Sequence, residues 1–200
     1  MHLIPAHGDA GFYGARVPFL IFRPSLLNIA SLGNPAEIVA LFESVMGTAD
    51  TNLQMWDAMA VLLACAEDKD AATEAVGYYG VMGWQEGEMP LEHVLHLARH
   101  MLLHGVVGDV EIKTPAASNT PMQEFKASQF VALAVAHLGM STTDAWGMSM
   151  TALVDALNAK FPQVQNPKKN EPGGSAPTMV EHDEAMAWFD EIDRSRKNGK

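Results

Sequence analysis

The stretch RPSLLNIASLGNPAEIVALFESVMG, residues 23–47, contains the start and stop signals of two successive helices. A Pro-Ser pair opens the first helix, and Gly33 ends it. Asn34 then suits an N-cap, with a proline at the first helical position and Glu37 three residues after the cap, as in a capping box. Gly47 ends the second helix. Because these signals agree with one another, the stretch predicts a helical fold.

Apolar spacing predicts further helices along most of the chain. In residues 51–70 the apolar positions 55, 56, 59, 62, 63 and 66 recur as on a buried helix face. The second half of residues 121–139 is apolar all round, which predicts a central place in the core. Ser141 opens another helical segment by capping-box spacing, and a further one covers about 149–160.

Strand patterns are scarce. Residues 12–22, FYGARVPFLIF, are aromatic and β-branched with a Gly and a Pro, which predicts a short N-terminal β ribbon or hairpin. Residues 77–90, GYYGVMGWQEGEMP, carry four glycines and are interpreted as a loose region. Residues 106–121 are interpreted as a loop, with room for a short extended piece.

These patterns together predict a mainly α fold with an appended tail. A single helical domain with its N-terminal β ribbon covers residues 1–162. Residues 163–178 contain three Pro and two Gly without a large aromatic residue or Leu, which is typical of a flexible linker. Residues 179–200 predict a C-terminal amphipathic helix, because its apolar residues recur at i, i+3, i+4 and i+7.

The charge balance restricts the class of partner. The 200 residues include 13 Lys and Arg against 24 Asp and Glu, a net charge of −11. Such a chain is repelled by phosphate backbones and anionic membrane surfaces, so we expect neither nucleic acid nor membrane as a partner. Neither a signal peptide nor a membrane-spanning apolar run is evident. With one cysteine and therefore no internal disulfide, the sequence favours a cytoplasmic location.

Four histidines lie in the predicted helix LEHVLHLARHMLLHG, residues 91–105: His93, His96, His100 and His104. They fall within roughly an 80° arc, nearly opposite the apolar side chains, so we expect them to face solvent, another subunit or a loop. Positions 93 and 104 are about 16 Å apart, so one ion can take only a neighbouring pair and needs ligands from elsewhere. A metal site and a pH response are the two alternatives.

No other motif predicts chemistry. Glycine motifs for nucleotides, a nucleophile elbow and zinc-binding spacings are absent from the sequence. Cys65 lies within an apolar helical run, which predicts an inert buried thiol. Glu67, Asp68 and Asp70 follow that run and are interpreted as a solvated loop rather than a Ca²⁺ or Mg²⁺ site. We therefore expect neither enzymatic activity nor a cofactor or bound metal.

Apolar residues in two places are candidates for binding another protein. The candidates are Trp146, Met148 and Met150 in the domain, and Trp188, Phe189 and Ile192 in the terminal helix. Thirteen methionines are many for this length, and Met suits both irregular cores and adaptable binding surfaces. Core packing is therefore the alternative for the first group. The terminal helix can dock on its own domain, bind a partner or stay disordered.

Three segments resemble proteins of tailed bacteriophages. FRPSLLNIASLGNPAEIVALFESV resembles the opening of small phage proteins in which an extended segment leads into Arg-Pro-Ser and a helix. GWQEGEMPLEHVLHLARHMLLHGVVGD resembles the Met-Pro, Ala-Arg-His and His-Gly-Val-Val-Gly signature of a phage family of about this length. ASQFVALAVAHLGMSTTDAWGMSMTALVDALNAKFP is similar to the recurring segment of phage tail assembly chaperones.

The resemblance implies a helical, non-enzymatic protein that is encoded with the tail genes. Such a protein binds the tape measure protein in the host cell cytoplasm while the tail tube assembles, without necessarily remaining in the virion. The alternatives are a structural virion component, such as a head-tail connector or minor tail protein, and a histidine-based metal-binding protein.

Overall fold

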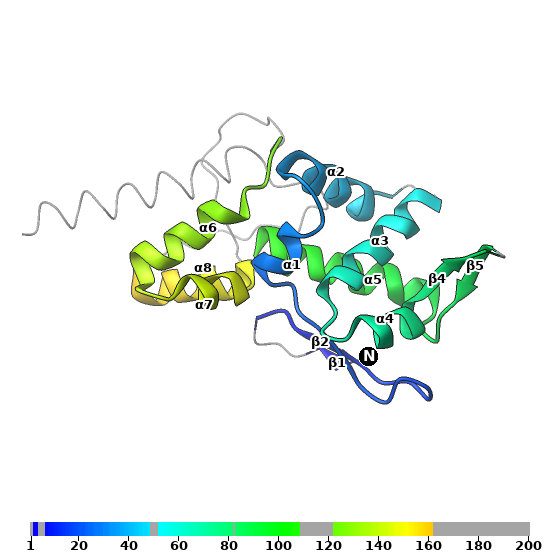
Figure 1. Ribbon diagram of the computed structural model, residues 1–200. Coiled ribbons are helices and arrows are strands. Elements are labelled where there is room, and N and C mark those ends of the chain that lie inside the picture. Colours follow the sequence, from blue (N-terminus) through cyan, green and yellow to red (C-terminus); the bar gives the residue numbers. More distant parts are fainter. Residues whose placement is uncertain (1, 4–6, 49–51, 82, 109–121, 162–200) are drawn as a thin grey trace, which may run out of the picture.

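The computed structural model describes residues 2–3, 7–48, 52–81, 83–108 and 122–161. The predicted linker and C-terminal helix, with Trp188, Phe189 and Ile192, lie outside these residues. Within the described residues the fold is mainly helical, with a small N-terminal antiparallel sheet, as the sequence predicts. Figure 1 shows α6, α7 and α8 at one end of the molecule and strands β4 and β5 at the other.

The predicted N-terminal ribbon is confirmed and gains a third strand. Its strands are β1 (His2–Leu3), β2 (Ala10–Phe12) and β3 (Leu20–Phe22), in the order β1-β2-β3. β2 and β3 form an antiparallel hairpin in which Ala10 lies opposite Phe22. The outer edge of β3 is also paired, because Phe22 bridges Ala66 and the backbone of Arg23 donates to the carbonyl of Cys65 at 2.7 Å.

Most helices begin at the residues that the sequence indicates. They are α1 (Leu26–Ala30), α2 (Pro35–Met46), α3 (Asn52–Cys65), α4 (Lys69–Val76), α5 (Leu91–Leu102), α6 (Ala127–Leu133), α7 (Thr142–Gly147) and α8 (Met150–Lys160). The π-helical turns η1 (Leu103–Val107) and η2 (Ala134–Leu138) continue α5 and α6. Asn34 and Glu37 form the predicted capping box, and Ser141 caps α7. None of the helices in the described residues is long and apolar enough to cross a membrane.

Two elements differ from the sequence prediction. The predicted acidic loop after α3 is the start of α4, because the Asp68 carboxylate accepts from the backbone of Asp70 and Ala71, both at 3.0 Å. The predicted loose region contains a second hairpin, formed by β4 (Gly77–Gly80) and β5 (Gly83–Glu86). Its glycines hid the strand pattern, since Gly is depleted in strands.

Helices α2, α3 and α5 are tied together at the C-terminal end of α2. The side chain of Gln54 on α3 is buried and donates to the carbonyls of Ser44 at 3.0 Å and Gly47 at 2.8 Å. Arg99 on α5 donates to the carbonyls of Val45 at 2.9 Å and Gly47 at 2.8 Å. Side chains from two neighbouring helices therefore satisfy the last carbonyl groups of α2, which would otherwise lack intrahelical partners.

The predicted buried faces of two helices need correction. Met59 and Leu62 on α3, and Ala66 just after it, are buried as expected, but Trp56 is 44% exposed. Apolar residues surround most of α3, so spacing alone did not identify its inner side. The predicted core helix of residues 121–139 also leaves one side in solvent, where Val135 is 36% exposed. Alanine and valine cover that side, and small side chains lose little by exposure.

Candidate functional site

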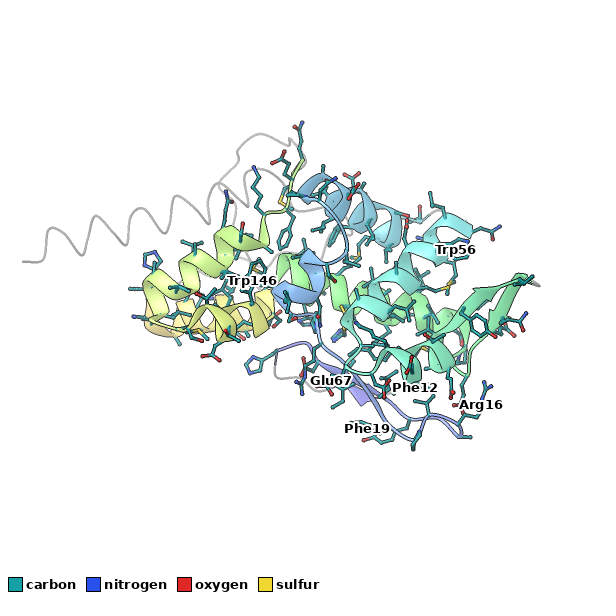
Figure 2. The ribbon with its side chains drawn as sticks, in the orientation of Figure 1. Phe12, Arg16, Phe19, Trp56, Glu67 and Trp146 are labelled. Carbon is teal, nitrogen blue, oxygen red and sulfur yellow. The ribbon has the colours of Figure 1, made fainter. Side chains whose placement is uncertain are left out.

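Two of the three predicted contact residues in the domain lie where α1 meets α7. The backbone N–H of Leu26 donates to the carbonyl of Met148 at 2.7 Å, and Ser25 forms a β-bridge with Ser149. These contacts hold the end of α7 against the start of α1. Trp146 lies close to α1 in Figure 2.

The predicted contact residues of the domain differ in how far they are exposed to solvent. Trp146 and Met148 are half-buried against the core, and Leu27 on α1 is 56% exposed. We call Leu27, Trp146 and Met148 the α1–α7 surface. Met150 is only 3% exposed, which makes it a core residue and corrects its predicted role in partner contact. Its side chain points inward because it begins α8, whose buried face includes Leu153.

The histidine helix divides into an exposed half and a packed half. His93 and His96 are exposed, as expected. His104 is only 8% exposed, and its Nδ1 lies 2.8 Å from the Thr151 hydroxyl. The His100 ring donates from Nε2 to the carbonyl of Gly8 at 3.0 Å, since a carbonyl can only accept.

The four histidines were expected to face solvent, another subunit or a loop. The segment at Gly8 adjoins His100 and His104, whereas the contact of His104 with Thr151 on α8 was not expected. The helical wheel located the side opposite the main apolar face, but Gly8 and α8 cover the C-terminal half of that side. The rings of His100 and His104 lie with centroids 4.3 Å apart. No group of three or more His, Cys, Asp or Glu among the described residues is arranged to hold a metal ion.

The cysteine and the acidic residues considered as possible reactive or metal-binding groups have structural roles. Complete burial raises the pKa of Cys65 to about 12, so its thiol is inert, as predicted. Asp68 caps α4, and Glu67 pairs with Arg23 at 2.8 Å. Burial also raises the pKa of Asp9, although its ion pair with Arg23 opposes the shift.

Sequence reasoning missed four further exposed apolar residues. They are Leu53 (65% exposed), Trp56 (44%), Tyr78 (52%) and Val81 (105%). The first two come from the N-terminal half of α3 and the others from the β4–β5 hairpin. A signal was present in the sequence, because GYYG and GWQE are aromatic segments separated by two residues, the commonest hairpin loop length.

Negative charge is concentrated in the part of the chain that runs from α1 into α5. Residues 24–98 contain eleven Asp and Glu but one basic residue, Lys69. The Lys69 ammonium group donates to the carbonyls of Leu63 and Ala64, so it caps the C-terminus of α3. Residues 24–98 thus account for ten of the eleven net negative charges of the chain.

Comparison with known proteins gives a family but no activity. No curated protein and no solved structure matches the chain. Residues 48–173, more than half of the sequence, match a family of unknown function (DUF6246). The matched range includes α3 to α8 and the β4–β5 hairpin, but it excludes α1, α2 and the N-terminal sheet. The chain therefore belongs to the DUF6246 family.

Proposed function

We propose that the protein is a phage tail assembly chaperone that binds the tape measure protein and catalyses no reaction. The observation that carries the proposal is the α1–α7 surface. Trp146 and Met148 lie in the segment, residues 127–162, that resembles the recurring part of tail assembly chaperones. Leu27, in another of the three resembling segments, is exposed on α1, whose first turn is hydrogen-bonded to the end of α7.

The physical properties of this surface suit a helical client. Trp contributes strongly to many interfaces because it buries a large area at low entropic cost. Met adapts to irregular apolar partners. The backbone contacts between α1 and α7 hold these side chains in place before binding, which lowers the ordering cost. The net charge of −11 favours solubility of a complex with an apolar client.

Affinity capture of the tagged full-length protein from phage-infected cells tests the proposal. We expect mass spectrometry to find the tape measure protein in the captured material, and to find this chain absent from purified virions. Recovery of connector or tube proteins, with this chain in virions at fixed copy number, would instead identify a structural virion component.

Substitutions separate binding at this surface from a general effect on the protein. We expect Leu27→Ser combined with Met148→Ser to weaken capture of the tape measure protein. Val135→Ser, at an exposed apolar residue on η2, is the matched control and should leave capture unchanged. Equal capture by both variants and the natural chain would remove the α1–α7 surface from the proposal.

The terminal segment provides a further test of the same function. The sequence predicts that Trp188, Phe189 and Ile192 also contact the client. We therefore expect deletion of residues 179–200 to weaken capture while the helical circular dichroism signal of the domain persists. Unchanged capture would assign client binding to the domain alone.

A further inference from the structure

Two histidines attach the N-terminal segment around Gly8 to the helical part of the molecule. His100 on α5 donates from Nε2 to the carbonyl of Gly8 at 3.0 Å. His104 on η1 lies against the same glycine, because a Cβ on Gly8 would overlap the Cβ of His104. The Nδ1 atom of His104 also lies 2.8 Å from the hydroxyl oxygen of Thr151 on α8. The two rings therefore join three segments that are far apart in the sequence.

The rings of His100 and His104 form a close pair. Their centroids are 4.3 Å apart, His104 is only 8% exposed, and His100 is half-buried. Neutral rings suit this arrangement, since each neutral imidazole has one N–H donor and one acceptor nitrogen. Protonation of both rings places two positive charges side by side, and burial leaves little water to screen their repulsion. The geometry therefore disfavours the doubly charged pair.

Charged groups on the neighbouring elements are exposed or bound to other partners. Asp9 pairs with Arg23 at 3.2 Å, and Arg99 donates to the carbonyl groups at the end of α2. His7, His96 and Asp155 are exposed on the N-terminal segment, α5 and α8. Helix α1, which also packs against η1, carries no titratable residue. The described carboxylates on these elements are therefore placed in solvent or on Arg23.

We propose that the His100–His104 pair is a pH-sensitive attachment of the N-terminal segment around Gly8. Near neutral pH the pair carries at most one proton, and Gly8 stays packed against both rings. A second proton, taken up at mildly acid pH, makes the rings repel each other and releases Gly8. Strands β2 and β3 stay paired with each other, and Phe22 stays bridged to Ala66. The proposal is independent of the role in tail assembly.

The direction of the pH effect follows from proton uptake. Histidine side chains without special surroundings titrate near pH ~6.5. Below that pH the released form binds one proton more than the attached form, so the attached form is lost as pH falls and is favoured as pH rises. One proton of difference changes the equilibrium constant for release by up to about tenfold per pH unit. We therefore expect release to become about tenfold more favourable between roughly pH 7 and pH 5.5.

Nuclear magnetic resonance of the full-length protein with 15N-labelled histidine rings tests the proposal. After assignment of the ring signals, a pH titration follows each protonation separately. We expect His100 and His104 to titrate as a coupled pair in two separated steps, with the amide signal of Gly8 changing in the second step. Independent titration of both rings near pH ~6.5, or a Gly8 signal that follows neither step, would overturn the proposal.

Substitutions separate the effect of the protons from an effect of packing. Urea denaturation should show that the natural chain loses stability between roughly pH 7 and pH 5.5. His100→Gln should reduce this dependence, because a glutamine amide can donate to the Gly8 carbonyl but takes up no proton. His96→Gln is the matched control, since His96 is exposed one turn earlier on the same helix, and it should keep the dependence of the natural chain.

The same pH dependence in His100→Gln as in the natural chain would show that the pair is not the sensor. The ring titrations use the natural chain, so they decide the proposal whether or not His100→Gln folds.

Discussion

The two hairpins of this protein have opposite relations to the core. In β2–β3, Phe12, Leu20 and Phe22 are buried, and both outer edges of the hairpin make backbone pairings. In β4–β5, Tyr78 and Val81 are exposed and the strands pair with each other. The first hairpin therefore contributes to the core of the fold, whereas the second leaves apolar side chains in solvent.

The carboxylate of Glu88 also holds the loop of the first hairpin in place. Glu88, just after β5, accepts hydrogen bonds from the backbone of Ala15, Arg16 at 3.0 Å and Val17 at 3.1 Å. Burial alone would raise the pKa of Glu88, but these hydrogen bonds outweigh it and the net pKa is lowered. The base of the second hairpin therefore helps to hold the first.

The largest expected effect is loss of packing in the first hairpin. Phe22→Ala removes a fully buried ring on β3 and should lower the free energy of unfolding by about 3–5 kcal/mol. Urea denaturation followed by circular dichroism measures the change. A loss below about 1 kcal/mol would mean that the N-terminal sheet is not part of the cooperative core.

Substitution of Gly8, which precedes β2, tests how closely this segment packs against His104 on η1. Gly8 has φ +82°, and a Cβ there would overlap the Cβ of His104. Gly8→Ala should destabilise the fold by about 2–4 kcal/mol, from backbone strain and steric overlap together. Gly139→Ala is the matched control, because Gly139 has φ +71° with open space around its Cβ, and should cost about 1–2 kcal/mol. Equal losses would show that the contact with His104 is loose.

The pH dependence of Glu88 gives a smaller effect. Because folding lowers the pKa of Glu88 below its ordinary 4.5, its stabilisation is present above that value and is lost as pH falls through the folded pKa. We expect Glu88→Gln to be less stable than the natural chain at pH 7, with the difference shrinking at acid pH. A pH-independent difference would assign the effect to packing.

The smallest effect on stability is expected in the second hairpin. Val81→Ser and Tyr78→Ser change exposed side chains, so each should alter the free energy of unfolding by no more than about 0.5 kcal/mol. Urea denaturation checks this. A loss comparable to that of Phe22→Ala would mean that the second hairpin is also structural.

Local signals in the sequence predicted much of the fold. The capping residues Asn34, Glu37 and Ser141 act within a few residues of their own position, so their pattern was readable. The aromatic and β-branched residues of the first hairpin were equally clear. The second hairpin was missed because its glycines resemble those of a loop.

Contacts between segments that are far apart in the sequence could not be predicted from local sequence patterns. His104 is buried by Gly8 and Thr151, and neither contact leaves a mark in the periodicity of α5. The predicted contact residues Met148 and Met150 illustrate the same point. Met148 and Met150 are two residues apart, yet the first is half-buried and the second lies in the core.

Amide hydrogen exchange followed by mass spectrometry compares the two hairpins most directly. We expect the amides of Ala10–Phe12 and Leu20–Phe22 to be protected nearly to the global stability of the protein. The amides of Gly77–Gly80 and Gly83–Glu86 should exchange faster, because the two strands pair with each other and Tyr78 and Val81 are exposed. Equal protection of both hairpins would contradict the claim that the first hairpin belongs to the cooperative core and the second does not.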